Sequence, residues 1–368
     1  MDRSTLMNGT MGLLAVFAVA ELAYALVARR GVHTFRDTLS SLGLGIGQQA
    51  INIYLSATFL GLFVGVHERF ALTSLDMGTW WHWLLFVPAC DFSYYVAHRA
   101  MHTVNFWVAA HIVHHQAEDY NHLSAMRQSW TAWIVNFPFF VWLALFVPLE
   151  MFVVGQLGIM FLQFLSHNGV YTGRLGVLDR IFVTPANHRV HHGINGPYLG
   201  ANCGGMFVIF DRLFGTYVEE DPDIPIEMGS GLAVPFYDPF EANLDYYRRV
   251  WFVMRHRRGL LPKLAIWLQS PETLFAELER LDYERHHPPR QVERGPLSPR
   301  DKALAASALV ASVGALAWHR GGFADHALAV QLVSGAVVIA AVGVLGRVLS
   351  RPAGPQLSVG GRSDVRAK

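Results

Sequence analysis

Long apolar segments alternate with short polar stretches over most of the chain, and this pattern predicts helices that cross a membrane. A membrane-spanning helix needs about 20 mostly apolar residues. Seven segments approach that length: 11–28, 43–66, 79–97, 130–147, 150–167, 303–319 and 326–348. The fourth and the fifth meet at Pro148, Leu149 and Glu150, which predicts a helical hairpin. We therefore expect an all-α fold, a polytopic membrane protein with about seven transmembrane helices.

The second apolar segment contains three glycines, Gly43, Gly45 and Gly47. Small residues on a membrane helix can let a neighbouring segment approach closely. The three glycines can equally be residues of an apolar segment with no specific packing role. The sequence leaves both interpretations open.

The distribution of arginine predicts the orientation in the membrane. Arg29, Arg30 and Arg36 follow the first apolar segment. Because cytoplasmic loops carry an excess of Lys and Arg, we expect the N-terminus outside and, after seven spans, the C-terminus inside. The predicted localisation is that of a multi-pass integral membrane protein, in the inner membrane of a bacterium or the endoplasmic reticulum of a eukaryote.

Composition divides the chain into five regions: an N-terminal span and linker (1–42), a core with the histidine motifs (43–220), a cytoplasmic or interfacial region (221–300), two C-terminal spans (301–350) and a disordered tail (351–368). Within the third region, basic residues alternate with aromatic and aliphatic ones over 246–271. This predicts a helix at the level of the lipid headgroups, with a plain soluble helix as the alternative. Residues 285–300 have the composition of an unstructured linker.

The overall composition agrees with a membrane protein. Hydrophobic residues make up 52% of the chain and charged residues only 15%, against about 25% charged residues in soluble domains. The net charge of +1 gives no reason to expect a nucleic-acid partner. The two cysteines, Cys90 and Cys203, form neither a disulfide framework nor a CxxC motif.

Nine of the eighteen histidines fall in a pattern: eight repeat helical spacings, and His167 ends the fifth apolar segment. They are His98 and His102; His111, His114 and His115; His167; and His188, His191 and His192. The i, i+3 and i+4 spacings place the members of each motif on one helical face, and the predicted topology brings all nine to the same side of the membrane. Neutral imidazole is a common ligand of iron, zinc and copper. Unrelated interfacial histidines would not repeat this spacing, so the pattern predicts a metal centre.

The number of histidines predicts two metal ions rather than one. A single ion cannot accept nine imidazoles. Adjacent residues on a helix diverge by about 100°, so His114 and His115, and likewise His191 and His192, are expected to serve different ions. We expect each ion to be surrounded by four or five imidazoles from at least three segments, with the ions roughly 3.5 to 7 Å apart.

Polar residues near the histidines are candidates for supporting roles. Asp91 lies seven residues before His98 on the same helical face, and a carboxylate near a membrane span is costly. We expect it to be catalytically important by accepting a hydrogen bond from a ligand histidine; a water-facing Asp is the alternative. His122 follows His115 by seven residues. It is a candidate either for a metal ligand or for a residue that contacts a ligand.

Two further groups of residues have structural or binding interpretations. Five residues around the second motif either anchor it or bind a polar headgroup: Glu118, Asp119, Asn121, Arg127 and Gln128. Asp211 and Arg212, in the sequence DRLFGT, are expected to stabilise the histidine-rich cap.

Three stretches together resemble a known superfamily. They are DFSYYVAHRAMH (91–102), HIVHHQAEDYNHLSAMRQS (111–129) and the segment from Thr184 to Glu220 that ends in DRLFGTYVEE. They resemble the fatty acid hydroxylase and sterol desaturase superfamily of membrane diiron oxygenases, and EDYN, RQS and DRLFGTY are most similar to its alkylglycerol monooxygenase branch. The resemblance covers about residues 45–220.

The resemblance implies a helical membrane core with a cytoplasmic histidine cap around two iron ions. It also implies that all nine histidines are iron ligands. It also implies O2 as cosubstrate and an external electron donor, which for this branch is tetrahydrobiopterin. The sequence departs from the family at two positions. Tyr171 stands where some members have a further histidine, and Thr103 stands where the branch usually has glutamate. The electron donor therefore stays open between tetrahydrobiopterin and a separate donor protein or reductant.

The resulting functional hypothesis is an enzyme that hydroxylates a lipid alkyl chain or ether lipid taken from the bilayer. The first alternative is a sterol or isoprenoid lipid desaturase or hydroxylase with the same diiron site. A membrane metal transporter is a distant alternative, because a transporter places ligands near the bilayer midplane and all nine histidines are predicted on one side.

Overall fold

The fold is helical, as the apolar segments predict. The computed structural model describes residues 3–231, 236–287, 296–321, 323 and 326–352. Among these residues, the β-structure is limited to one bridge between Phe182 and Phe207. The predicted tail lies mostly outside the described residues, as does half of the predicted linker, residues 288–295.

Seven elements correspond to the predicted membrane segments. They are α1 (Arg3–Val27), α2 (Phe35–Phe70), α3 (Trp80–Thr103), α6 (Ala132–Phe140) with the 3-10 helix η2 (Val141–Leu145), α7 (Leu149–Ser166), α14 (Pro299–Arg320) and α15 (Leu328–Leu349).

Five of these helices are long and apolar enough to cross a membrane: α1, α2, α7, α14 and α15. Helix α3 has 24 residues but is not among these five, and the segment Ala132–Leu145 is shorter. The length and apolar character of these helices therefore indicate an integral membrane protein. The number of seven transmembrane helices stays a prediction.

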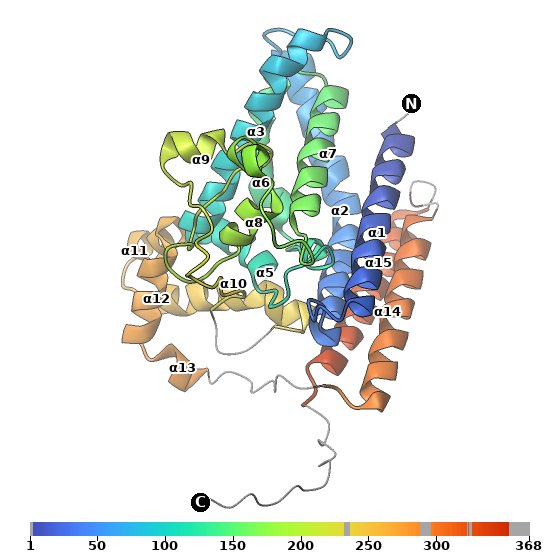
Figure 1. Cartoon of the computed structure of the whole chain (residues 1–368), viewed down its shortest axis with the longest axis vertical. Helices are drawn as coiled ribbons and strands as arrows, with labels where there is room; N and C mark the ends of the chain where they lie inside the picture. Colours follow the sequence, from blue (N-terminus) through green and yellow to red (C-terminus); the bar gives the residue numbers. More distant parts are fainter. Residues whose placement is uncertain (1–2, 232–235, 288–295, 322, 324–325, 353–368) are drawn as a thin grey trace, which may run out of the picture.

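The long helices form the body of the molecule. Helices α14 and α15 pack against each other and against α2. Helix α1 packs against α7, and α7 in turn contacts α2; all three are labelled in Figure 1. The buried core between α2, α3, η2 and α7 is aromatic and aliphatic; Phe63 and Phe152, for example, stack with their ring centroids 4.4 Å apart.

Short helices form a cap at one end of α3 and α7. They are α4 (Asn105–Val108), α5 (Ile112–His115), η1 (Ser124–Met126), η3 (Gly176–Arg180), α8 (Pro185–His191) and α9 (Ile209–Phe214). A second layer packs beneath them, formed by α10 (Pro239–His256), α11 (Leu260–Ala265), η4 (Ile266–Leu268), α12 (Pro271–Arg280) and α13 (Tyr283–His286).

The prediction of one helix over 246–271 is wrong. Helix α10 ends at His256, and α11 begins at Leu260 after a turn. Gly259 has a φ of +84°, a conformation that interrupts a helix and suits glycine. The break lets η4 and α12 fold back onto α10, so that Val250, Val253 and Ile266 share one buried core.

The three glycines of α2 are sites of close approach. A Cβ on Gly45 would lie 2.8 Å from the backbone oxygen of Met126, and one on Gly47 would lie 2.7 Å from the ring of Trp130. At Gly43, the side chain of Leu345 on α15 lies 3.0 Å from the Cβ position. The glycines therefore let η1 and its neighbours lie directly against α2, which decides between the two interpretations of the sequence.

This packing predicts a position-dependent effect of alanine on α2. Gly45→Ala should lower the melting temperature in detergent, because a backbone oxygen cannot move away cheaply and overpacking costs about 1–3 kcal/mol. Gly61→Ala on the same helix is the matched control, since nothing lies within 4 Å of its Cβ position. Equal melting temperatures for the two variants would contradict the close approach.

Candidate metal centre

Four separate elements supply the nine histidines. His98 and His102 lie near the C-terminal end of α3, and His167 is the C-cap residue of α7. Helix α5 is a single turn that begins after His111 and ends at His115. Helix α8 begins at Pro185, a residue suited to a first helical position, and its last turn and C-cap carry the remaining three histidines.

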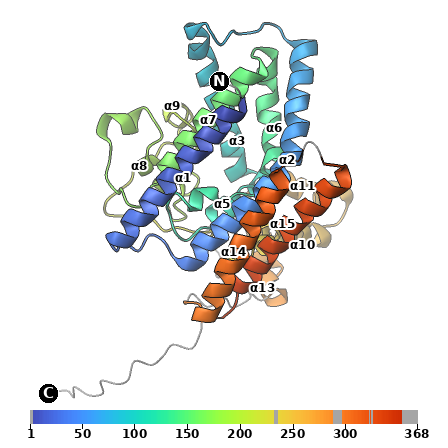
Figure 2. The same cartoon turned by 90° about the vertical axis from the view of Figure 1, so that its right-hand side faces the viewer.

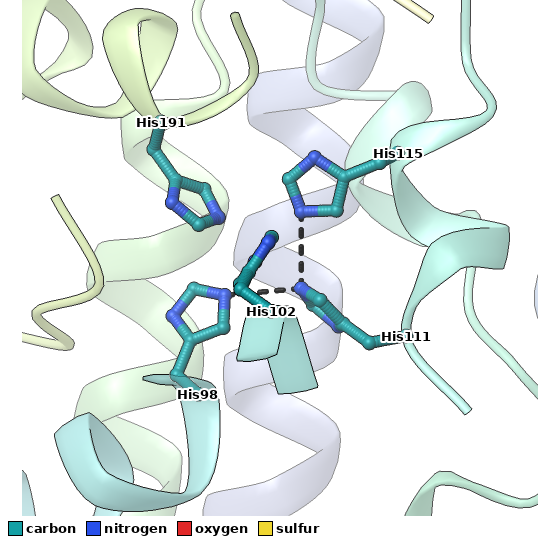
Figure 3. A group of neighbouring side chains, drawn as sticks. All are labelled: His98, His102, His111, His115 and His191. Atoms are coloured by element: carbon teal, nitrogen blue, oxygen red, sulfur yellow. Dashed lines mark hydrogen bonds between the residues drawn. The ribbon is translucent and has the colours of Figure 1, made fainter. Parts of the chain in front are cut away.

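Five of the nine form one group, shown in Figure 3. Each contributes a ring nitrogen, and these nitrogens all lie within 4.8 Å of one another: His98, His102, His111, His115 and His191. They come from α3, α5 with its N-cap, and α8. We call this set the five-histidine group.

The other four form a second group with the same separation of ring nitrogens: His114, His167, His188 and His192. They come from α5, the end of α7, and α8 with its C-cap. We call this set the four-histidine group. The two groups adjoin, because the rings of His115 and His192 stack with centroids 4.4 Å apart.

Adjacent histidines divide between the groups, as the helical geometry predicts. The ring planes of His114 and His115 are 86° apart, and those of His191 and His192 are 89° apart. In each pair, one ring belongs to the five-histidine group and the other to the four-histidine group. Each group therefore has members from three of the four segments.

Backbone carbonyls set the tautomers of four of these rings. In each, the Nδ1 atom lies at hydrogen-bond distance from a carbonyl oxygen: His98 with Cys203 (3.0 Å), His114 with Arg127 (3.0 Å), His167 with Gln163 (2.7 Å) and His191 with Ala201 (2.9 Å). A carbonyl only accepts, so Nδ1 carries the hydrogen. The Nε2 lone pair of each ring is then free, in the arrangement typical of metal-bound histidines.

The donor atoms fit metal ions better than they fit one another. The Nε2 atoms of His114 and His167 are 3.1 Å apart, although their carbonyl partners leave both without a hydrogen. Two facing lone pairs repel unless a cation lies beside them. Among the described residues, His102, His191 and His192 also have a buried Nε2 with no hydrogen-bond partner, and an unpaired buried polar atom is costly.

Burial keeps the imidazoles neutral. Desolvation lowers the pKa of His114 and of His191 to about 4. It also lowers the pKa of His115 and His188 well below the usual value, and neighbouring histidines add to that effect. Since only neutral imidazole donates a lone pair to a metal, the cap holds these rings in the binding form at neutral pH.

The glycine-rich loop of residues 203–207 lies next to the five-histidine group. Three side chains form hydrogen bonds with its backbone. The Asp91 carboxylate on α3 accepts hydrogen bonds from the backbone N–H groups of Met206 (2.6 Å) and Phe207 (3.1 Å). The Asp211 carboxylate accepts from the N–H groups of Cys203 and Gly204.

The side-chain amide of Gln163 on α7 supplies the third connection. Its Nε2 donates to the carbonyl oxygens of Gly204 and Gly205. Together the three side chains place the Cys203 carbonyl that accepts from His98.

The expectation that Asp91 accepts a hydrogen bond from a ligand histidine is therefore wrong. Its carboxylate contacts backbone N–H groups, and the Cys203 carbonyl is the partner of His98. The cause is that the loop folds back over α3, so that its unpaired N–H groups reach the carboxylate first. Asp91 acts on the histidine through the loop.

Arg127 anchors the second histidine motif. This fully buried guanidinium donates to the carbonyl oxygens of Val113 (2.9 Å) and Phe236 (2.6 Å), and it lies 3.6 Å from the Asp37 carboxylate. Asp119 and Asn121 bind the segment before α2 through Thr34 and Val32. These contacts favour anchoring over headgroup binding.

The remaining candidate residues lie outside the two groups. His122 contacts the Glu21 carboxylate, with Nδ1 3.0 Å away, and Tyr171 donates its hydroxyl to the Arg174 carbonyl at an exposed position. Arg212 lies over the Tyr217 ring at 4.0 Å. With Asp211 it stabilises the cap, as expected from the sequence.

Sequence reasoning missed three residues that support the surroundings of the site: Gln163, Tyr120 and Glu21. Gln163 lies four residues before His167 on α7, so its helical spacing was a usable signal. Tyr120 stacks on the His167 ring with centroids 5.4 Å apart, and only its place in the EDYN motif indicated it. Glu21 lies far away in sequence and gave no such signal.

The site and the fold define a class before any comparison is made. Helices able to span a membrane end in a cap where nine buried or partly buried imidazoles converge. This is the architecture of a membrane metalloprotein with a histidine-ligated centre.

Comparison with known proteins identifies the family. Residues 83–216, which include all nine histidines, match the family described as fatty acid hydroxylase. This match over part of the chain supports the predicted superfamily. The family and the two histidine groups together indicate iron as the metal.

Curated relatives support the predicted branch. The chain is 31% identical to alkylglycerol monooxygenase of Homo sapiens over 241 residues, which is 64% of this chain and 52% of the relative. It is 30% identical to alkylglycerol monooxygenase of Xenopus tropicalis over 237 residues, again 64% and 52%. The chain thus matches about half the length of these relatives. No solved structure matches it significantly.

The geometry predicts the metal content. Purified protein should carry about two metal ions per chain, and His114→Ala or His191→Ala should lower that number, because each removes a ligand from one group. Elemental analysis measures the ratio. His256→Ala is the control, since this ring bonds to the Phe252 carbonyl of its own helix and belongs to neither histidine group. Full metal content in both site variants would contradict the assignment.

Proposed function

We propose that this protein is a membrane-bound, non-haem diiron oxygenase that uses O2 to hydroxylate a lipid alkyl chain or ether lipid. The observation that carries the proposal is the arrangement of nine imidazoles in two adjoining groups within a fatty acid hydroxylase domain. The relatives named alkylglycerol monooxygenase support an ether lipid as the substrate class.

Iron with O2 and two external electrons supplies an oxidant strong enough for an unactivated C–H bond, which no protein side chain can supply. An all-histidine donor set suits Fe(II) but also Zn(II), so the choice of iron rests on the family. The nine histidines would hold two ions, with the five-histidine group around one and the four-histidine group around the other.

The chain's own residues would orient the ligands and keep the centre dry. The carbonyls of Cys203, Arg127, Gln163 and Ala201 hold four rings in one tautomer each. Such hydrogen bonds to the outer nitrogen fix ring orientation and raise ligand basicity. The buried packing of the cap excludes water, which protects an oxidising centre from side reactions.

Substrate approach is proposed from the side of the five-histidine group. His102 and His111 are partly buried, whereas all members of the four-histidine group are buried. The segment that joins these two residues contains Phe106, which is 41% exposed, and Trp107, whose ring packs against Phe139. An apolar and aromatic approach suits a lipid chain.

The outer surface of α3 and α9 suits a bilayer. On α3, Trp80, Leu84 and Phe92 are exposed, and the adjoining α9 exposes Ile209 and Leu213. Ring contacts between Phe92 and α9 make the two surfaces continuous. A lipid held in the membrane would therefore lie next to the elements that carry the site.

The electron donor is proposed to be external. The sequence contains no flavin, haem or iron–sulfur motif, which supports a separate donor protein or a small reductant such as tetrahydrobiopterin. Thr103, at the position where the branch usually has glutamate, donates its hydroxyl to the Arg99 carbonyl of its own helix. It therefore offers no carboxylate beside the first histidine motif.

Lipid profiling tests the function. Cells that express the protein under O2 should accumulate a lipid with a mass increase of about 16, because one oxygen atom is inserted. The control is His114→Ala in the same cells. A decrease of about 2 would indicate desaturation, and an unchanged lipid profile with an iron-loaded enzyme and a supplied reductant would contradict the proposal.

The proposed topology places the histidine cap in the cytoplasm, with the α2–α3 loop on the opposite side. Thr172→Cys, near the cap, and Thr73→Cys, in that loop, both put a cysteine at an exposed position. Membrane-impermeant thiol reagents should label position 73 from outside and position 172 only after permeabilisation. The native cysteines are both buried. Labelling of both positions from the same side would refute this orientation.

A further inference from the structure

A buried carboxylate on α1 reaches two loops of the metal centre. Glu21 is 4% exposed and lies in a helix that could cross a membrane. One carboxylate oxygen accepts the backbone N–H of His122 at 2.6 Å, and the other accepts the N–H of Gly169 at 2.7 Å. Glu21 therefore joins the loop after α5 to the loop after α7.

Residues of these two loops surround part of the four-histidine group. Gly169 follows His167 by two residues. Tyr120, two residues before His122, stacks on the His167 ring and donates its hydroxyl to the Ser166 carbonyl at 2.7 Å. The position of His167 thus depends on how closely the two loops lie together.

The loops touch at a point that only glycine permits. A Cβ on Gly169 would meet the backbone oxygen of Tyr120 at a distance that real Cβ atoms do not show. This contact brings the Tyr120 carbonyl and the start of the α7 loop together beside the Glu21 carboxylate. The two N–H groups that Glu21 accepts belong to this same junction.

The charge of Glu21 has a specific partner. The Nδ1 atom of His122 lies 3.0 Å from the carboxylate, and Nε2 of His33 lies 3.8 Å away. A carboxylate is expensive to bury in a membrane span unless it is paired and hydrogen-bonded. The two N–H groups and the adjacent imidazole of His122 meet that requirement here.

We infer that Glu21 is a positioning residue for the four-histidine group, acting on His167 through the junction of the two loops. Helix α1 lies outside the residues that match the fatty acid hydroxylase family. The N-terminal helix then supports the metal centre in addition to crossing the membrane. The inference rests on the proposed diiron function, because it needs an ion in each group.

Glutamine at this position would keep the shape but remove the interaction. Its one carbonyl oxygen can accept from one loop, and its NH2 group would face the N–H of the other. Aspartate would keep the charge, but it is shorter by one methylene, about 1.5 Å, and cannot reach both loops. Both variants should loosen the junction without removing any ligand.

The experiment measures release of iron to a chelator under anaerobic conditions. Wild-type protein should release its two ions slowly. In Glu21→Gln, one ion should leave about 10- to 100-fold faster, matching the 10- to 100-fold loss of metal affinity that follows removal of support for a ligand, while the other keeps the wild-type rate. Glu21→Asp should behave in the same way with a smaller effect. Tyr24→Phe, at a 51% exposed position of α1, is the matched control and should release both ions slowly.

Ligand variants assign the fast phase to a group. His188→Ala removes a ligand of the four-histidine group, so Glu21→Gln should add no fast phase in that background. His102→Ala affects the five-histidine group, so the fast phase should persist there. Wild-type release rates for both ions in the Glu21 variants would overturn the inference, and so would equal acceleration of both ions with a lower melting temperature. Absence of iron from the wild-type protein would instead contradict the proposed function.

Discussion

The central constraint in this protein is the convergence of many nitrogen lone pairs in a volume shielded from water. Neutral imidazoles that point their Nε2 atoms at one another repel, as His114 and His167 would at 3.1 Å. Two kinds of partner relieve the repulsion: cations at the centre and hydrogen-bond acceptors on the outside. The backbone carbonyls on the Nδ1 atoms supply the second kind, and the cap is folded so that they lie where they are needed.

The carbonyls are placed by side chains that contact no histidine of the two groups. The Cys203 carbonyl depends on Asp91, Asp211 and Gln163, which come from α3, α9 and α7. The position of the second motif depends on Arg127, buried among carbonyl and hydroxyl oxygens. Charged groups are costly in this environment, so their use here indicates that ligand geometry takes precedence over the stability that apolar packing would offer.

The helices outside the family domain also serve the site. The α14–α15 hairpin packs on α2, and the glycines of α2 bring η1 and the Arg127 segment close to that helix. On the other side, α1 contributes Glu21 to the junction near His167. The membrane helices thus form a rigid frame around loops that would otherwise have too few contacts to hold nine ligands.

The sequence alone determined the class of fold and the identity of the nine histidines. Apolar length and helical spacing are local properties, so the long helices, the division of His114 from His115 and the superfamily could all be predicted. Tertiary structure decided the partners. Asp91 binds a loop over a hundred residues away, Gly259 ends a helix that periodicity alone extended, and Glu21 reaches Gly169 across 148 positions. Hydrogen bonds between distant segments depend on how the chain folds back on itself, and no local pattern encodes that.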